Sequence, residues 1–248
     1  MIFSELQQEL GKRVLGALSD FYRTHDLGKA SMAYSGGLDS SILLAMAPRT
    51  VIPYTLGNET SKDYSNSKDG AKKLGFNVVS IRLSSVKLES YVNTVMEIDP
   101  GIRKNDLGYE VVLAALLDNM EGKEVITGQG ADEVFYGYNI FRVNPGLDNR
   151  LHMEKLLRET IPREGAIAEH FGKKLITPYL SGEILKIMKN VDRDTNFSGD
   201  INKAVLRSAA VQAGLPPEIA ERKKTAAQYG SGLMKMLKKL PIWNTLPQ

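Results

Sequence analysis

The feature that most constrains the fold is an alternation of short apolar runs with longer amphipathic segments. The runs are SMAYS (31–35), TVIPYTLG (50–57), NVVSIRL (77–83) and EVITG (124–128). Helical spacing predicts helices over about 1–25, 39–47, 62–74, 84–97 and 108–120. Strands that alternate with helices are joined by crossover connections, so we expect an α/β fold with a parallel sheet and helices on both faces.

The pattern changes near residue 145. After this point strand signals fade, and RLHMEKLLRETI, SGEILKIMKNV, DINKAVLRSAAVQAG and PEIAERKK are typical of helices separated by Pro and Gly. We therefore expect an α/β domain over 1–148 and a helical carboxyl-terminal lobe over 149–248 that completes the active site.

Composition excludes several function classes. The 248 residues carry a formal net charge of +3, which gives no sign of a nucleic acid or membrane partner. The sequence contains no cysteine, which excludes disulfides, thiolate metal sites and a cysteine nucleophile on these residues. No run approaches the roughly 18 apolar residues that span a bilayer, and the first residues lack a signal-peptide pattern. We expect a cytoplasmic protein.

The stretch AYSGGLDSS follows the first predicted strand and opens a helix. Such a turn directs backbone N–H groups and a helix N-terminus at one point, which is typical of a phosphate site. Its residues are Ser35, Gly36, Gly37, Leu38, Asp39 and Ser40. A carboxylate beside a phosphate requires a cation between them, and Mg²⁺ is the obvious candidate for Asp39. The alternative is a tight turn before a helix whose dipole Asp39 complements.

A second glycine-rich loop, GQGADEVFYGY, follows the strand predicted at 124–128. It brings Gly128, Gln129, Asp132 and Glu133 to the same edge of the sheet. If the two strands are neighbours, Asp39 and Asp132 could hold one magnesium ion across a triphosphate. Taken alone, GADE would be a solvated turn.

These motifs resemble a known family. SGGLDSS resembles the pyrophosphate loop of the N-type ATP pyrophosphatase superfamily, and GQGADEVFYGY resembles the asparagine synthetase signature G-E-G-[AS]-D-E-[LIV]-F-G-G-Y. Downstream, Lys203 and Arg207 match a K-x-x-L-R helix, and Arg222 and Lys224 match L-P-x-x-[IV]-x-x-R-x-K. The resemblance covers about residues 15–235 and is to the synthetase part of asparagine synthetases and their relatives, including the β-lactam synthetases.

The resemblance implies a PP-loop fold of the adenine nucleotide alpha hydrolase type. It also implies an ATP-dependent carbon–nitrogen ligase that uses Mg²⁺, adenylates a carboxylate with release of pyrophosphate, and transfers the acyl group to ammonia or an amine. The implied catalytic residues are Asp39, Gln129, Asp132, Glu133 and Lys224, with Asp39 and Asp132 as metal ligands. The implied ATP or pyrophosphate-binding residues are Ser35, Gly36, Gly37, Leu38, Asp39, Ser40, Gly57, Gly128 and Arg222.

The sequence departs from the family pattern at the acceptor side. Gln129 stands where the signature has glutamate, and an amide cannot act as a general base at ordinary pH, so the base lies elsewhere, with Glu133 a candidate, or the acceptor reacts without one. Tyr136 replaces the first glycine of GGY, which we expect to narrow the pocket. Ile176 and Ser181 replace an arginine and an aspartate. The acceptor is therefore an unidentified carboxylate, of which aspartate is one possibility.

Partners and two other functions follow from the same pattern. Ammonia or an amine would come from solution or from a separate glutaminase subunit, and we expect a homo-oligomer. One alternative is a PP-loop enzyme that adenylates a tRNA base or another carbonyl, although no basic tract with interleaved aromatics supports it. The other is a catalytically silent nucleotide-binding regulatory subunit, which Gln129 makes credible.

Overall fold

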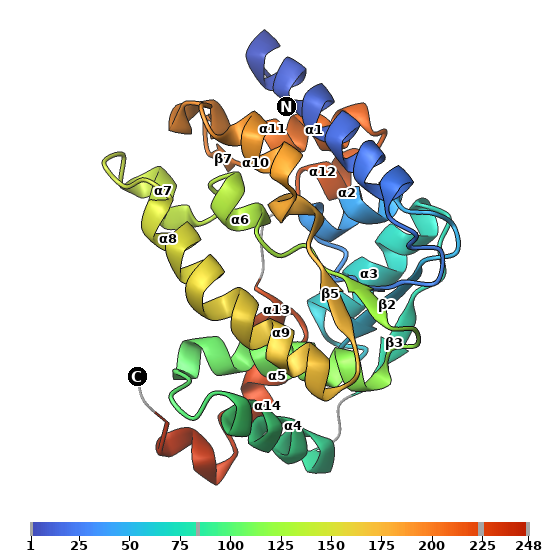
Figure 1. Ribbon diagram of the computed structural model, residues 1–248, viewed down its shortest axis with the longest axis vertical. Coiled ribbons are helices and arrows are strands. Elements are labelled where there is room, and N and C mark those ends of the chain that lie inside the picture. The colour runs from blue at the N-terminus through green and yellow to red at the C-terminus, as the bar shows by residue number, and fades with distance from the viewer. Residues whose placement is uncertain (1, 83–84, 223–225, 247–248) are drawn as a thin grey trace.

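A five-stranded parallel sheet lies at the centre of the fold, in the order β3-β2-β1-β4-β5 (Figure 1). The structure is a computed structural model that describes residues 2–82, 85–222 and 226–246. The strands are β1 (Ser31–Ala33), β2 (Ile52–Leu56), β3 (Val79–Ile81), β4 (Glu124–Ile126) and β5 (Lys174–Ile176). Every neighbouring pair is parallel, which confirms the predicted sheet.

The helices of the first half follow the predicted ranges. They are α1 (Glu5–Thr24), α2 (Leu38–Met46), α3 (Lys62–Lys73), α4 (Ser85–Ile98) and α5 (Lys104–Asn119). Helix α1 begins at a capping box, in which the Ser4 hydroxyl accepts from the Gln7 N–H and the Gln7 side chain accepts from the Ser4 N–H. Local sequence thus fixes where this helix starts.

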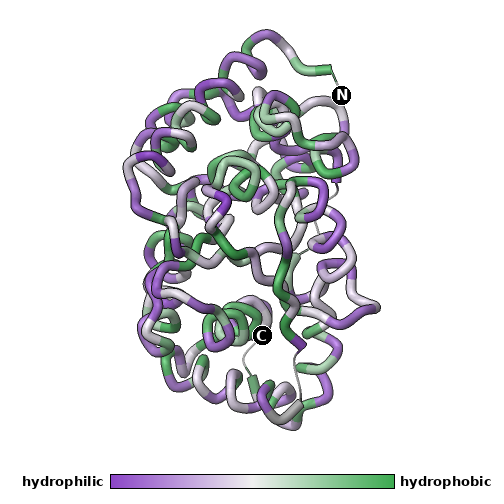
Figure 2. Tube along the Cα trace, turned by 90° about the vertical axis from the view of Figure 1, so that its right-hand side faces the viewer, coloured by the Kyte–Doolittle hydropathy of each residue, from purple (hydrophilic) through white to green (hydrophobic). Residues whose placement is uncertain are grey.

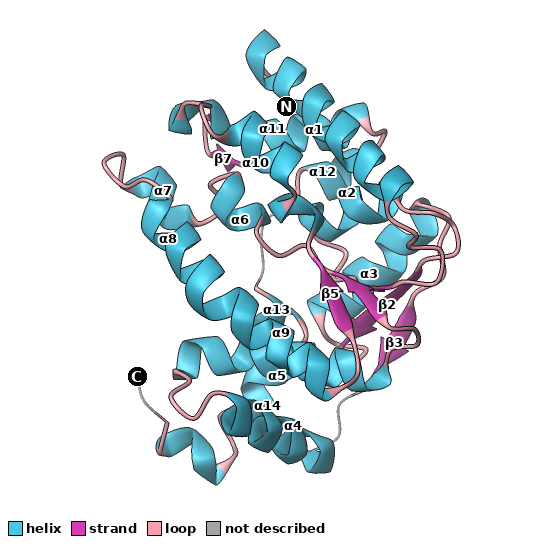
Figure 3. Cartoon of the chain, in the orientation of Figure 1, coloured by secondary structure: helices cyan, strands magenta, loops and turns pink. Residues whose placement is uncertain are grey.

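The second half is mainly helical, as expected (Figure 3). Its longer elements are α8 (Arg150–Lys155), a π-helical turn η1 (Leu156–Thr160), α9 (Ile161–His170), α10 (Gly182–Met188) and α11 (Ala204–Gln212). The shorter ones are α6 (Ala131–Val134), α7 (Asn139–Val143), η2 (Pro178–Leu180), η3 (Arg193–Asn196), β6 (Phe197–Ser198), β7 (Ile201–Asn202), α12 (Pro217–Ala220), α13 (Ala227–Gly230), α14 (Leu233–Leu237) and η4 (Pro241–Asn244). Strands β6 and β7 form a small antiparallel pair of their own.

Two hydrophobic clusters cover the two faces of the main sheet. Helices α1, α2, α10, α11 and α12 contribute to one cluster, and α4, α5, α9 and α14 contribute to the other. The alternation of strand side chains is visible in β4, where Val125 belongs to one cluster and Ile126 to the other. Figure 2 shows the hydrophobic stretches running through the middle of the trace and the hydrophilic ones mostly at its edges.

Strand β5 was not expected, because the sequence signals for strands fade after residue 145. It pairs with β4 from Glu124↔Lys174 to Ile126↔Ile176, and three residues are too few to show periodicity. The sheet therefore crosses the expected boundary at residue 148. The division into two lobes stays a prediction.

The strand order places the functional loops. It reverses direction between β1 and β4, and ligands in open α/β sheets bind beside the carboxyl ends of the strands at such a switch point. The loops that follow β1 and β4 contain the two glycine-rich motifs. Within the described ranges, no helix combines the length and the apolar character needed to cross a bilayer.

Candidate active site

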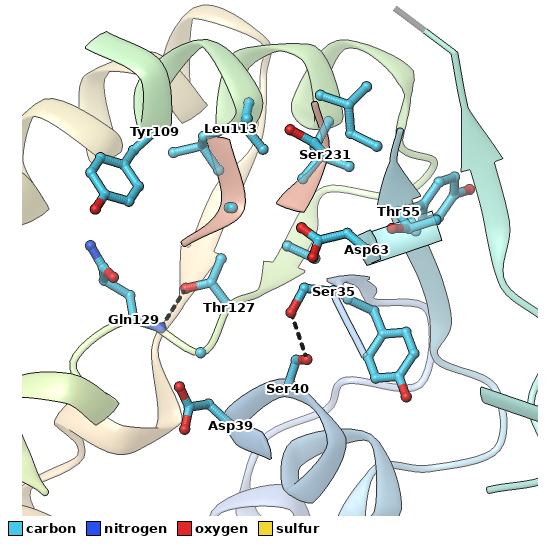
Figure 4. A pocket seen from close by; sticks show the side chains of 18 of the residues that line it. Ser35, Asp39, Ser40, Thr55, Asp63, Tyr109, Leu113, Thr127, Gln129 and Ser231 are labelled. Atoms are coloured by element: carbon cyan, nitrogen blue, oxygen red, sulfur yellow. Dashed lines mark hydrogen bonds between the residues drawn. The ribbon is translucent and has the colours of Figure 1, made fainter. Parts of the chain in front are cut away.

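The turn after β1 has the predicted form. Gly36 adopts a φ of +71°, and Gly37 is the N-cap of α2. The Ser35 hydroxyl accepts from the Gly37 N–H at 3.2 Å and lies 3.4 Å from the Ser40 hydroxyl (Figure 4). A Cβ at position 36 would lie 2.4 Å from the Asn66 carbonyl carbon of α3, so the loop and this helix touch through their backbones. Both the left-handed φ and the close approach require glycine.

The second loop meets the first, as the sequence predicted. Strands β1 and β4 are neighbours, with Met32 opposite Ile126. A Cβ at Gly128 would lie 3.4 Å from the Asp39 Cβ. Gly130 has a φ of +88° and is the N-cap of α6, the short helix that contains Asp132 and Glu133.

One buried lysine joins the two predicted metal ligands. The Lys203 Nζ lies 2.7 Å from both Asp39 carboxylate oxygens and 2.8 Å from Asp132 Oδ1. Burial acts to lower the pKa of Lys203, but the carboxylates of Asp132 and Asp39 outweigh it and hold this pKa above its ordinary value. Gly137 makes room for the contact, since a Cβ there would lie 2.0 Å from Asp132 Oδ1 and 2.1 Å from Lys203 Cε.

The two carboxylates suit a magnesium ion only together with a ligand. The described residues contain no group of three or more His, Asp or Glu side chains placed to hold a metal. Asp39 and Asp132 do lie close enough to share one ammonium group, that of Lys203, at hydrogen-bond distance. This donor set fits Mg²⁺, which protein sites commonly hold with one or two carboxylates, substrate phosphates and water.

A cavity of about 230 Å³ opens beside the loops (Figure 4). Its floor is formed by residues at the carboxyl ends of β1, β2 and β4, and its apolar wall includes Val112, Leu113 and Leu116 of α5. The charged side chains among its described lining are Asp39, Asp63 and Glu164, and none of those described residues is Lys or Arg. Its other lining residues are Ala33, Tyr34, Ser35, Ser40, Tyr54, Thr55, Leu56, Tyr109, Thr127, Gly128, Gln129, Ala227 and Ser231.

Gln129 lines this cavity and is paired with an acid. Its amide Nε2 donates to Glu164 Oε1 at 2.7 Å. Glu164 comes from α9, just after the π-helical turn and Pro162, and its side chain is buried. Burial, followed by the nearby charge of Glu110, raises the pKa of Glu164 well above its ordinary value. The carboxyl group of Glu164 therefore adjoins position 129, where the sequence departs from the family pattern.

Glu133, the other predicted base, is not among the lining residues of the cavity. It is buried, and the Tyr138 hydroxyl donates to its Oε1 at 2.6 Å. Its predicted catalytic role has no support from this placement and stays a prediction.

Three of the four remaining predicted residues lie in the described part of the chain. The Arg222 guanidinium donates to the Gly36 carbonyl, so this residue contacts the loop directly. Gly57 directly follows β2 and lines a small hollow that shares Leu56 and Ser231 with the main cavity. Leu38 is buried in the core at the start of α2. Lys224 lies outside the described residues.

A family comparison agrees with this geometry. The model of the asparagine synthase family matches residues 23–152 and 146–243. The chain belongs to the asparagine synthase family.

Known members of the family differ from this chain in length. It is 29% identical over 265 residues to a putative glutamine-hydrolysing asparagine synthetase of Methanocaldococcus jannaschii, covering 88% of this chain and 48% of that protein. It is 30% identical over 129 residues to asparagine synthetase domain-containing protein 1 of Bos taurus, covering 47% of this chain and 20% of that protein. The chain thus spans about half the length of the first relative and about a fifth of the length of the second.

One solved structure is also similar. NMN synthetase from Francisella tularensis is 13% identical, with a TM-score of 0.43 over 92% of this chain and 78% of that chain.

Tyr136, which stands where the family pattern has glycine, does not line this cavity, and its narrowing of the acceptor pocket stays a prediction. The residue keeps the left-handed backbone that glycine favours, with a φ of +54°. Its ring packs against Phe141 and Phe197, and its hydroxyl lies 3.2 Å from Asn149 Oδ1. It is not among the lining residues. These contacts offset the cost of the strained backbone.

Sequence analysis missed three residues of this candidate site. Lys203 appeared only as part of a helix match, and Glu164 and Asp63 were not singled out at all. Each is one charged residue near the start of an amphipathic helix, where a solvated position is the default expectation. That these three residues lie close to the two glycine-rich loops and the cavity is apparent only in the three-dimensional structure.

Proposed function

We propose that this chain is a magnesium-dependent, ATP-consuming ligase that adenylates a carboxylate and transfers the acyl group to ammonia or an amine. The observation that carries the proposal is that the carboxylates of Asp39 and Asp132 both contact the ammonium of Lys203 beside the SGGLDS loop. Membership in the asparagine synthase family supports an ATP-dependent ligase.

In the first step, an oxygen of the acceptor carboxylate attacks the α-phosphorus of ATP and pyrophosphate leaves. The N–H groups of the loop and of the first turn of α2 would face the phosphates, and the ammonium of Lys203 adds positive charge at the same edge. Asp39 and Asp132 would hold Mg²⁺, which neutralises charge on the phosphate oxygens when it is bound. Lys224 is proposed to act on the departing pyrophosphate.

In the second step, the amine nitrogen attacks the acyl carbon, a C–N bond forms, and the C–O bond to AMP breaks. The amine must lose a proton. Glu164 lines the cavity and accepts a hydrogen bond from Gln129. Because position 129 carries no base, we propose that the carboxylate of Glu164 accepts this proton. Ammonia from a separate glutaminase subunit is one source of the nucleophile.

The test measures pyrophosphate and AMP from ATP and Mg²⁺ across a panel of carboxylates, aspartate included, each with and without ammonium. We expect matched pyrophosphate and AMP with one carboxylate. Asp132→Asn should lower pyrophosphate release by about 100-fold or more, because a preorganised charge is lost. Glu164→Gln should keep carboxylate-dependent ATP–pyrophosphate exchange but lose amide formation.

Two exposed positions supply controls, Asp26→Asn for the aspartate and Glu169→Gln, on the same helix as Glu164. Full activity in Asp132→Asn would contradict the proposed site. ATP binding by the wild type with no pyrophosphate from any carboxylate would favour the silent regulatory subunit instead.

A further inference from the structure

Asp63 is a buried carboxylate for which the described residues supply no partner. It is the second residue of α3 and its side chain is about 5% exposed. Throughout the ranges that the structure describes, no hydrogen bond or ion pair reaches its carboxylate, and burial is the one influence on its pKa. A carboxylate with so little solvent around it and no described donor is costly to ionise, so its position calls for an explanation.

The helix itself does not explain Asp63. The N-cap of α3 is Ser61, and neither Ser61 nor Asp63 forms a side-chain bond to the N–H groups of the first turn. The Asp63 side chain instead projects into the cavity between Ser35 and Ser231 (Figure 4). It packs against Gly230, where an added Cβ would lie 2.1 Å from Asp63 Oδ1. This packing holds the carboxylate toward the cavity.

The described lining of the cavity offers no positive charge to pair with Asp63. The other charged side chains in the described lining are Asp39 and Glu164, which are also acidic. Asp39 has Lys203 and Glu164 has the Gln129 amide. No described residue donates to Asp63, which leaves its carboxylate available to a donor on a ligand.

The position of Asp63 indicates which part of a ligand it meets. It lies with Thr55 and Leu56 on the β2 side of the loop, close to the apolar wall of α5. Gln129 lies on the β4 side, because β1 separates β2 from β4. With the phosphates at the loop and the amine near Gln129 and Glu164, the β2 side is left for the nucleoside.

We propose that Asp63 determines nucleotide specificity by accepting a hydrogen bond from an N–H or O–H donor of the nucleoside of bound ATP. This inference rests on the proposed function, since it takes ATP as the ligand. The candidate donors are the amino group of the base and the ribose hydroxyls, which share the chemistry that a carboxylate accepts.

The test is calorimetric binding of ATP, purine riboside triphosphate, 2′-deoxy-ATP, 3′-deoxy-ATP and inorganic pyrophosphate. The first analogue lacks the amino group, and the next two each lack one hydroxyl. We expect the wild type to bind at least one analogue about tenfold more weakly than ATP, the scale of a hydrogen bond to a charged group. Asp63→Ala should reduce that difference to less than about twofold and leave pyrophosphate binding no weaker.

Asp26→Ala, at an exposed site, is the control for the loss of a carboxylate, and it should keep the discrimination of the wild type. Equal binding of ATP and all three analogues by the wild type would overturn the inference without any variant. Discrimination that persists in Asp63→Ala would overturn it too. Failure of the wild type to bind either ATP or pyrophosphate would instead contradict the proposed function, and the inference with it.

Discussion

The acidic side chains around the cavity differ in what compensates their charge. Asp39 and Asp132 share the ammonium of Lys203. Glu164 accepts a hydrogen bond from an amide, and Asp63 accepts none from the described chain. Compensation of charge is thus most complete beside the SGGLDS loop and least complete on the β2 side. A site that must bind a ligand can leave such a group unpaired until the ligand arrives.

Asp63 should make the free protein less stable at high pH. Burial raises its pKa from 3.8 to about 7, so the folded state binds the proton more tightly than the unfolded state. The free energy of unfolding therefore falls as the pH rises from about 4 to about 7, and the loss remains above that range. Asp63→Asn carries no such charge and should be more stable than the wild type at pH 8 by a few kcal/mol, since one pKa unit corresponds to about 1.4 kcal/mol.

Urea unfolding at pH 4 and pH 8 measures this effect without any ligand. The two proteins should differ least at pH 4, where the carboxyl of Asp63 is largely protonated in the folded state. The exposed Asp26→Asn should show no comparable gain. A gain for Asp63→Asn that is the same at both pH values would show that the carboxylate is not the source.

At the scale of elements, the junction of the first loop with α3 has no spare room. Gly36→Ala should destabilise the protein, because φ at this position is +71° and the new Cβ would lie 2.4 Å from the Asn66 carbonyl carbon. The left-handed backbone costs about 1–2 kcal/mol for a residue with a Cβ, and overlap with a backbone adds about 1–3 kcal/mol. Thermal unfolding of the variant and the wild type measures the sum.

Gly16→Ala is the matched control for that substitution. Gly16 is exposed in α1, and a Cβ there would meet nothing within 4 Å. This variant should gain about 0.5–1 kcal/mol from the reduced entropy of the unfolded chain. Similar changes in stability for the two variants would mean that the loop does not pack on α3 as described.

The elements with repeated local patterns could be predicted from sequence, and the contacts between them could not. Four strands and the helices around them follow from periodicity, and Gly36 follows from its motif. Strand β5 has three residues, too few for a period to appear. Glu164 is 35 positions from Gln129, and no local signal connects them. Asp63 resembles any charged residue on an amphipathic helix until the cavity around it is known.

At the scale of the molecule, the first helix packs against the carboxyl-terminal half of the chain. Helix α1 lies along α11, and β5 extends the sheet that β1 to β4 begin. The cluster on that face joins Val14 of α1 and Leu43 of α2 to Val205 and Leu206 of α11. The carboxyl-terminal half thus supplies both a strand and a large part of one core, in addition to Lys203.

A fragment of residues 1–148 should not fold by itself. Without the second half, β4 loses its neighbour β5, and the apolar faces of α1 and α2 lose the cover of α11. An exposed strand edge and large apolar surfaces favour aggregation over a unique fold. Because the contacts between the halves are noncovalent, coexpression of 1–148 with 149–248 should restore a complex that unfolds cooperatively in urea, with circular dichroism as the readout. A cooperative transition for 1–148 alone would establish an independent α/β domain that ends near residue 148, and β5 would then be an addition to a sheet already stable without it.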